Sequence, residues 1–332
     1  MFWNKNYDFL AIGETTMDAF IRLKDAKVHC NINNEDCELC VNFGAKIPFE
    51  MSKEIAAVGN AANAAVSASR LGLSSALVAN IGKDENGQKC KKTLEKDGVS
   101  TEYLRVNPDK DTNYHYVLWY EMERTILQKH SAFDYKLPSI RKPKWIYLTS
   151  LGDTSLPMHT EITEYLKKNP GVKMAFQPGI FQIKWGVEPV KEIYSQTEVF
   201  FCNVEEAKTI LKTEERDVKT LMKMVSELGP KKIFITDGIK GAYAYNKING
   251  EAWFMPVYPH DPYERTGAGD AFASTVISAL ALGKTLEEAL RWGPVNSMSV
   301  VQKIGAQEGL LTRPQLEKYL AEAPADYKPQ KI

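Results

Sequence analysis

The sequence predicts an α/β fold with a mainly parallel central sheet, helices on both of its faces and a small β-sheet lid. Two observations predict this architecture. Segments with the pattern of a buried strand alternate with segments of helical periodicity over most of the 332 residues. Two stretches, at about 19–55 and 101–130, break this alternation with short polar–apolar repeats and no long helix. We expect these stretches to pair into the lid, inserted into a single unit that spans residues 1–332.

The expected elements follow one another along the chain. Strands are expected at Tyr7–Ile12, Ala76–Ile81, Lys144–Leu148, Val172–Phe176, Glu198–Cys202 and Lys232–Thr236. Helices are expected at Asn60–Leu71, Asn86–Asp97, Met158–Lys168, Val204–Leu211, Val218–Leu228, Gly269–Leu282, Leu286–Lys303 and Arg313–Ala321. In the second lid stretch, the alternation over 114–120 and the run over 124–127 predict an antiparallel hairpin.

Charge and composition argue against two classes of partner. Lys plus Arg and Asp plus Glu number 42 each, whereas proteins that bind nucleic acid or membrane surfaces carry an excess of positive charge. The first residues lack the apolar segment of a secretion signal, and the longest apolar stretch, Ala271–Leu282, is too short to span a bilayer. We therefore expect a cytoplasmic protein with no nucleic-acid or membrane partner, and we expect its five cysteines to be reduced.

The most informative segment is Gly267-Ala268-Gly269-Asp270, which directly precedes a run of helical periodicity. Its small residues leave backbone N–H groups open to approach, and the positive end of the helix dipole points the same way, so the turn predicts an anion site. Asp270 would repel a phosphate that is only bound. A base that takes the proton of a hydroxyl as this hydroxyl attacks a phosphate explains its presence. The alternative is a tight turn with Asp270 as a helix cap.

Three earlier residues suit a ligand with several hydroxyl groups. The carboxylate of Asp18, which we place at the C-terminal end of a strand, can accept hydrogen bonds from two adjacent hydroxyls; a turn or helix cap is the alternative. Gly59 allows a ligand to approach the backbone closely, and Asn63, one helical turn later, offers both a donor and an acceptor. Tight packing of a helix on a sheet is the other explanation for this segment.

Two further segments follow predicted strands. Asn203 and Glu206 lie three residues apart at a strand-to-helix turn, so they face the same side; Glu206 can alternatively serve only to place negative charge at a helix N-terminus. Thr236 and Gly238 end a buried strand, which is where nucleotides bind in open α/β sheets. A simple hairpin turn is the alternative for this second pair.

Taken together, the motifs resemble those of the PfkB (ribokinase-like) family of carbohydrate and nucleoside kinases, in the order of that family and over nearly the whole chain. The similar segments are Gly13–Asp18, Val58–Asn63 with Arg70–Gly72, Ile81–Asp84 with Gly87, Glu123–Leu127, Asn203–Glu206, Thr236–Gly238 with Gly241, and the turn at 267–270. The resemblance implies the family's three-layer α/β/α sandwich. It also implies ATP-dependent phosphorylation of a hydroxyl of a sugar, sugar derivative or nucleoside.

The resemblance assigns roles as well. Asp270 would be the general base, and the N–H groups of Gly267, Ala268 and Gly269 would stabilise the transferred phosphoryl group. The acceptor would be held by Asp18, Gly59 and Asn63. The nucleotide and its phosphates would contact Asn203, Glu206, Thr236, Gly238, Gly241 and, beside the adenine, Asn296. Magnesium would be held by Glu206 through water, and a homodimer through the lid is implied.

Three positions depart from the family pattern. Val58 replaces a glycine, which should narrow the substrate pocket. Glu264-Arg265-Thr266 replaces a segment that many relatives use for a monovalent cation, which puts potassium activation in doubt. Gln177 stands before a proline where relatives tend to have Asp or Asn.

The cysteines leave a second metal question open. Cys30, Cys37 and Cys40 include a C-x2-C spacing that is compatible with zinc, but a second matching pair is missing and the segment falls in the lid. We assign Cys90 and Cys202, in a predicted helix and a predicted strand, to the core.

Two other functions remain as alternatives. One is a catalytically idle relative that binds a sugar or nucleotide for regulation, against which the intact Asp270 counts. The other is a dinucleotide-binding oxidoreductase, which lacks the required G-x-G-x-x-G after the first strand, where Gly13-Glu14-Thr15 stands instead.

Overall fold

The computed structural model describes all residues except 1–5, 31–36 and 122. Its main sheet runs, in spatial order, through β16 (Gln330–Lys331), β15 (Glu251–Met255), β14 (Ala242–Asn246), β13 (Lys232–Thr236), β12 (Val199–Asn203), β11 (Lys173–Phe176), β10 (Trp145–Leu148), β1 (Phe9–Ile12), β6 (Ser75–Gly82) and β7 (Leu104–Asn107). Neighbours from β13 to β7 are parallel, and the three pairs from β13 to β16 are antiparallel. The predicted mainly parallel sheet is confirmed.

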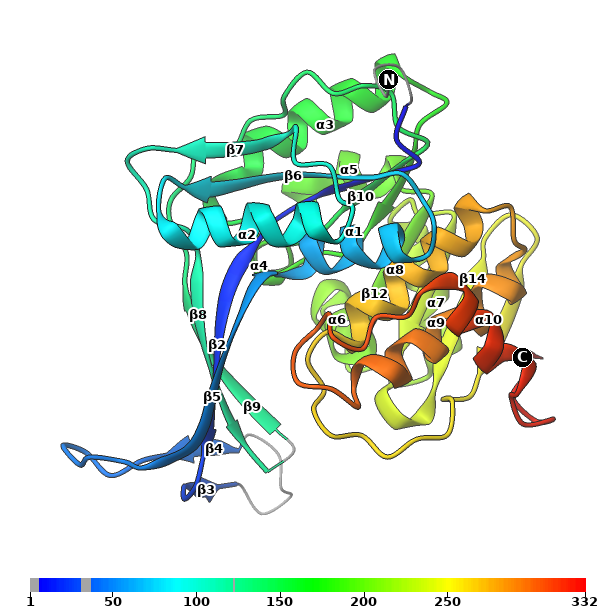
Figure 1. Cartoon of the computed structure of the whole chain (residues 1–332). Coiled ribbons are helices and arrows are strands. Elements are labelled where there is room, and N and C mark those ends of the chain that lie inside the picture. The colour runs from blue at the N-terminus through cyan, green and yellow to red at the C-terminus, as the bar shows by residue number, and fades with distance from the viewer. Residues whose placement is uncertain (1–5, 31–36, 122) are drawn as a thin grey trace.

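Helices cover both faces of this sheet (Figure 1). One face carries α1 (Asn60–Arg70), α2 (Glu85–Lys96), α8 (Ala268–Ala281), α9 (Leu286–Val300) and α10 (Arg313–Ala321). The other carries α3 (Leu156–Lys168), α4 (Ile180–Trp185), α5 (Lys191–Gln196), α6 (Val204–Leu211) and α7 (Val218–Glu227). In the described part of the chain, no helix is long and apolar enough to cross a membrane.

The central strand β1 explains why the sheet needs helices on both sides. Phe9 and Ala11 point into one hydrophobic core, whereas Leu10 and Ile12 point into the other. Side chains alternate between the faces of a strand, so a strand that is apolar throughout must be covered on both faces. The predicted strands and helices are all present, with boundaries that shift by at most three residues. The short helices α4 and α5 escape prediction because six residues hold too little helical periodicity.

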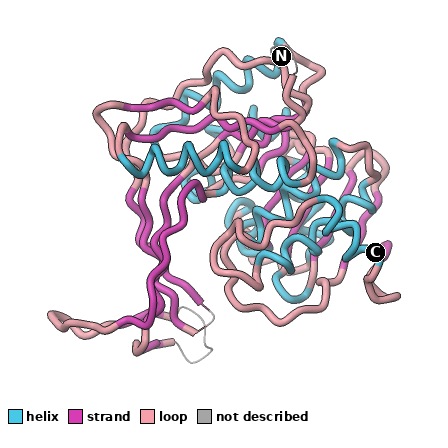
Figure 2. Tube along the Cα trace, in the orientation of Figure 1, coloured by secondary structure: helices cyan, strands magenta, loops and turns pink. Residues whose placement is uncertain are grey.

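The lid is a separate sheet with the order β5 (Phe49–Val58), β2 (Thr16–Leu23), β8 (Tyr114–Tyr120) and β9 (Glu123–Lys129). It extends away from the main body, with the hairpin of β3 (Lys27–His29) and β4 (Glu38–Cys40) near its far end (Figures 1 and 2). The sheet uses both predicted stretches but begins at Thr16 and continues to Val58, so the first stretch is longer than expected. Asp18 consequently lies inside β2, not at the end of a core strand as predicted.

The cysteines differ in part from the prediction. Cys30 and Cys37 form a disulfide beside the β3–β4 hairpin, so the expectation of five reduced thiols is wrong for this pair. Because a disulfide sulfur is not a thiolate, Cys37 cannot join Cys40 in a zinc site in this state. Cys90 and Cys202 are buried, as expected. Among the described residues, His, Cys, Asp and Glu form no cluster of three or more that could hold a metal ion.

Candidate active site

The Asp270 carboxylate lies in the first turn of α8, where two amides of α1 hold it. Asn60 Nδ2 donates to Asp270 Oδ1 at 2.9 Å, and Asn63 Nδ2 donates to Oδ2 at 2.8 Å. Burial raises the pKa of Asp270 above its usual range, although these amides and the positive charge of Arg124 act in the opposite direction. An oriented carboxylate with a raised pKa is suited to accept a proton.

Asn63 is itself fixed by the protein. Its Oδ1 accepts a hydrogen bond from Gln307 Nε2 at 3.0 Å, and Gln307 Nε2 also donates to the carbonyl of Ala57 at 2.6 Å. Both ends of the Asn63 amide therefore have protein partners. The geometry makes Asn63 a residue that orients Asp270, which differs from the predicted contact with the acceptor.

The turn that begins α8 has the shape of an anion site. Gly267 has a φ of 80°, and a Cβ at this position would lie 2.4 Å from the Cβ of Ala306, so only glycine fits. At Gly269 a Cβ would meet only Gln177 Nε2, at 3.8 Å, which leaves this side of the turn open. Since the first N–H groups of a helix have no partner within the helix, they can bind an anion directly beside Asp270.

A pocket of about 1090 Å3 lies next to this turn. The predicted residues Thr236, Gly238 and Gly241 line it from the end of β13, and Ala268 and Gly269 line it from α8. The remaining lining combines polar and charged residues with apolar ones: Asp237, Lys240, His260, Asp261 and Arg265, and Val257, Pro259, Phe272, Pro294, Met298 and Val301. A pocket that combines apolar side chains with the start of a helix fits a ligand that has both a base and phosphates.

Asn296 does not belong to this pocket, so its predicted place beside the adenine is wrong. Its side chain is fully buried: Nδ2 donates to Thr275 Oγ1 at 2.8 Å and to Ser67 Oγ at 3.4 Å, and Oδ1 accepts from the backbone N–H of Leu311 at 2.9 Å. These bonds tie α9 to α1 and α8. The next residue on α9, Ser297, lines the pocket instead.

Asn203 and Glu206 face each other at the start of α6. Asn203 Oδ1 accepts from the backbone N–H of Glu206 at 2.8 Å, and Glu206 Oε2 accepts from the backbone N–H of Asn203 at 2.9 Å. This capping box confirms the helix start and fixes both side chains. Burial raises the pKa of Glu206, and the negative charge of Asp270 acts in the same direction, so the two carboxylates share one electrostatic environment.

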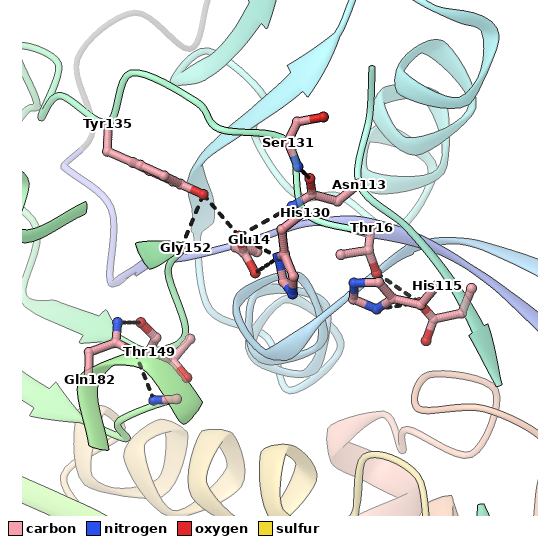
Figure 3. A network of polar contacts seen from close by, with 12 residues as sticks. Glu14, Thr16, Asn113, His115, His130, Ser131, Tyr135, Thr149, Gly152 and Gln182 are labelled. Carbon is pink, nitrogen blue, oxygen red and sulfur yellow. Dashed lines mark hydrogen bonds and ion pairs between the residues drawn. The ribbon is translucent and has the colours of Figure 1, made fainter. Parts of the chain in front are cut away.

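A second polar cluster, which sequence reasoning did not find, lies where the lid joins the core (Figure 3). The Glu14 carboxylate accepts from Tyr135 OH at 2.9 Å and from Asn113 Nδ2 at 3.2 Å, and it lies 3.3 Å from His130 Nδ1. A Cβ on Gly59 would lie 3.1 Å from the backbone oxygen of Glu14, so this glycine allows the close approach of two backbones. The partners of Glu14 are about 100 residues away, and no spacing motif signals them.

Asp18 lies in the same region. Thr16 Oγ1 donates to Asp18 Oδ1 at 2.9 Å, and His115 Nδ1 lies 3.4 Å from the same oxygen. Asp18 and His115 are direct neighbours on the parallel strands β2 and β8. The rings of His115 and His130 are 5.2 Å apart, so the lid brings the pairs Asp18–His115 and Glu14–His130 together.

The lid also contacts the segment before the α8 turn. Arg265 Nη1 donates to Glu123 Oε1 at 2.8 Å, and Arg22 Nη1 donates to Tyr263 OH at 3.0 Å. The rings of Trp119 and Tyr263 meet edge to face, with their centroids 5.1 Å apart. The lid therefore touches the core at the Glu14 cluster and also at the loop over 263–265, which precedes the α8 turn.

Several relatives of the chain are kinases. The ribokinase of Haemophilus influenzae is 25% identical over 279 residues, which cover 81% of this chain and 89% of the relative. A 5-dehydro-2-deoxygluconokinase of Halalkalibacterium halodurans is 24% identical over 278 residues, which cover 78% and 83%. A cytidine kinase of Thermococcus kodakarensis is 34% identical over 116 residues, which cover 35% and 41%.

Solved structures share the fold. A putative ribokinase from Agrobacterium tumefaciens superposes with a TM-score of 0.80 at 17% identity, covering 96% of this chain and 98% of its own. A ribokinase from Arabidopsis thaliana, complexed with ribose and ATP, gives a TM-score of 0.79 at 18% identity, covering 95% and 99%. These likenesses confirm the predicted ribokinase-like architecture. Residues 39–313 match the family described as pfkB family carbohydrate kinase, and the chain therefore belongs to the PfkB family.

Proposed function

We propose that the protein transfers the γ-phosphoryl group of ATP to a hydroxyl of a sugar, sugar derivative or nucleoside, with Asp270 as the general base. The observation that carries the proposal is the position of this carboxylate: it is 8% exposed, held by two amides and adjacent to the α8 turn. The acceptor's proton passes to Asp270 as its oxygen forms a bond to the γ-phosphorus, and ADP leaves. The N–H groups of Gly267, Ala268 and Gly269 stabilise the charge on the phosphoryl oxygens.

ATP and Mg2+ fit the groups around the turn. The pocket that includes Thr236, Gly238 and Gly241 would take the nucleotide, so that its phosphates reach the α8 turn. Asn203 and Glu206 offer oxygen atoms, the ligands that Mg2+ prefers, and this ion keeps water and phosphate oxygens as its remaining ligands. A structural neighbour, a putative ribokinase II from E. coli, was solved in complex with ATP and Mg2+. When bound, magnesium would supply positive charge that neutralises the phosphates.

Asp18 and the backbone at Gly59 would hold the acceptor, since both lie beside the Glu14 cluster at the lid–core junction. The lid would exclude water that could otherwise accept the phosphoryl group from ATP. The use of ATP also favours the cytoplasm, which is the compartment we propose.

A requirement for a monovalent cation is not part of the proposal. The buried Glu264 carboxylate already accepts hydrogen bonds from the backbone N–H of Thr266 at 2.7 Å and of Gly305 at 3.3 Å. The adjacent Arg265 adds a positive charge to the same segment. We therefore expect equal rates in potassium chloride and in choline chloride at the same ionic strength.

A homodimer through the lid is the proposed assembly. Tyr116 and Leu127, which are neighbours across β8 and β9, are 48% and 53% exposed. Burying such an apolar pair against a second lid would be favourable. The double variant Tyr116→Glu, Leu127→Glu should then be a monomer in light scattering; an unchanged mass would contradict this assembly.

The test of the function is ADP release with ATP and Mg2+ against ribose, fructose, 2-keto-3-deoxygluconate, fructose 6-phosphate, adenosine, inosine and cytidine. A strong signal with one acceptor that is lost in Asp270→Asn supports the kinase and identifies its substrate. Stabilisation by ATP in a thermal-shift assay with no turnover on any acceptor would instead favour the alternative, a regulatory relative that binds without catalysis.

A further inference from the structure

Two histidines at the lid–core junction each have one ring nitrogen that is paired and one that is not. The Nδ1 of His115 faces Asp18 at 3.4 Å, and the Nδ1 of His130 faces Glu14 at 3.3 Å. The Nε2 of each ring is buried and has no hydrogen-bond partner among the described residues. Ten buried side-chain polar atoms among the described residues lack a hydrogen-bond partner, but only these two stand on rings whose centroids are 5.2 Å apart, so one ligand can supply both missing partners.

A third buried histidine shows that this state is not general in the molecule. His159, in α3, has Nδ1 at 2.9 Å from the backbone oxygen of Ser155 and Nε2 at 3.4 Å from Gln182 Nε2. Both of its ring nitrogens thus have partners within the core. The histidines of the junction therefore differ from this core histidine in having an unpaired Nε2.

The two imidazoles lie on the side of the site where the acceptor is expected. His115 lies next to the acceptor site, because its partner Asp18 is the residue proposed to bind the hydroxyls of the acceptor. His130 is paired with Glu14, whose backbone lies against Gly59. Gly59 in turn begins α1, the helix that orients Asp270 through Asn60. The cluster is therefore linked to the proposed base through the contact of Glu14 with Gly59 and the hydrogen bond of Asn60 with Asp270.

We propose that His115 and His130 bind the acceptor through their Nε2 atoms and that this acceptor is an uncharged polyhydroxylated molecule, a sugar or the sugar part of a nucleoside. The inference rests on the proposed function and refines it, because it separates neutral sugars from sugar acids. It also adds two residues that determine specificity, one from the lid and one from the segment that follows it.

The preference for a neutral acceptor follows from the charges that face the rings. A carboxylate only accepts hydrogen bonds, so the Nδ1 of each ring carries a hydrogen toward Asp18 or Glu14. If a ring is protonated, its own carboxylate compensates the positive charge, and no net charge remains to attract a sugar acid. Beyond the rings, the two carboxylates of Asp270 and Glu206 outweigh the single positive charge of Arg124 near Asp270, and this balance opposes an anionic acceptor.

The two rings also offer complementary contacts to hydroxyl groups. The hydrogen bond with Glu14 raises the pKa of His130, so its Nε2 carries a hydrogen over a wider pH range and donates. The other groups that face this ring are His115 and the Phe181 ring, whose centroid is 5.5 Å away. The Nε2 of His115 offers a second position at which a hydroxyl can form a hydrogen bond. A hydroxyl can satisfy either atom, because it both donates and accepts.

Steady-state kinetics of the full chain with ATP and Mg2+ test the inference, with ribose, cytidine and 2-keto-3-deoxygluconate as acceptors. His115→Asn and His130→Asn keep an amide near the position of Nδ1 but remove Nε2. We expect each to raise the KM for the neutral acceptor about tenfold, the effect of one lost hydrogen bond, and to leave the KM for ATP within about twofold. His130→Gln, whose amide N–H lies near the position of Nε2, should restore part of the affinity.

The pH dependence provides a readout that a merely structural role would not change. In the wild type, the KM for the acceptor should rise as the pH exceeds the raised pKa of His130, because Nε2 then loses its hydrogen. In His130→Gln this rise should disappear, since an amide does not titrate. The matched control is His159→Asn, which should lower the Tm without changing the acceptor's KM.

The outcomes separate the inference from the proposed function. If the wild type phosphorylates no acceptor, the proposed function fails; titration calorimetry with ribose and cytidine then tests the histidines without turnover, and equal affinities in wild type and both Asn variants overturn the inference. If the wild type is active, the inference is overturned by an unchanged acceptor KM in both Asn variants. A preference for 2-keto-3-deoxygluconate over ribose and cytidine overturns it as well.

Discussion

The α8 turn and the lid–core junction are both built around a buried carboxylate, but they are assembled in opposite ways. The turn places its glycines and Asp270 within four consecutive residues. The junction joins Glu14 to Asn113, His130 and Tyr135, across 99 to 121 residues of sequence. The comparison suggests that chemistry common to all acceptors is encoded locally, whereas contacts with one particular acceptor arise from tertiary structure.

The two carboxylates also differ in what they do to protons. Burial raises the pKa of Asp270 itself, which prepares it to take a proton. Glu14 acts on its neighbours: its hydrogen bond raises the pKa of His130, and its negative charge adds to the effect of burial in raising the pKa of Tyr135. The turn would therefore govern the rate of transfer, and the junction would govern acceptor affinity.

Asp270→Asn should have the largest effect of the variants that test this separation of transfer rate, assigned to the turn, from acceptor affinity, assigned to the junction. If Asp270 is the general base, as proposed, its replacement should lower kcat by about 10²- to 10⁴-fold. The acceptor's KM should change little, because the junction is untouched. The Tm should stay close to that of the wild type, because removal of a buried charge offsets the loss of one of the two hydrogen bonds from Asn60 and Asn63. A kcat within a few-fold of the wild type, measured with the acceptor that the panel identifies, would refute the assigned base.

A smaller decrease in kcat is expected from Gly267→Ala, which moves the α8 turn without removing the Asp270 carboxylate. The new methyl group would collide with Ala306, and a displacement on the order of 1 Å at a reacting group costs about 10²-fold in rate. Gly250→Ala is the matched control, because Gly250 has a φ of 72° and open space around its Cα. Both variants carry backbone strain of about 1–2 kcal/mol, visible in the Tm, but only Gly267→Ala should lose kcat. Equal rates in the two variants would argue against a catalytic turn.

The same comparison explains which parts of the fold and of the candidate site could be predicted from the sequence. The strands, helices and α8 turn were predictable because hydrophobic periodicity and a glycine-rich helix start are local patterns. Asn60 and Gln307 were not, since an isolated polar side chain gives no sign of the carboxylate or amide that it meets. Asn296 shows the reverse error: its amide is used up by core hydrogen bonds that only the packing of three helices reveals.

The pH profile should distinguish the two regions within one enzyme. As the pH falls through the raised pKa of Asp270, the proposed base becomes protonated, and kcat should fall about tenfold per pH unit below it. As the pH rises through the raised pKa of His130, the acceptor's KM should increase while kcat stays level. Profiles of kcat and KM from pH 4 to pH 9 measure both. If both limbs appeared in kcat alone, the division between rate and affinity would be wrong.

The smallest effect should come from the contact between the lid and the segment before the turn, Arg265 with Glu123. Both side chains are exposed, so the pair contributes at most about 1 kcal/mol, and Arg265→Ala should change kcat less than about fivefold. Its signature would be uncoupled hydrolysis, because a lid that opens more often admits water to ATP. The ratio of ADP formed to acceptor phosphorylated should rise above that of the wild type.

Lys129→Ala is the matched control, since it removes an exposed lid ion pair with Asp111 of nearly the same length, 2.7 Å against 2.8 Å. If both variants raised the ratio equally, the effect would reflect general loosening of the lid, and the Arg265 contact would have no special part in closing the site.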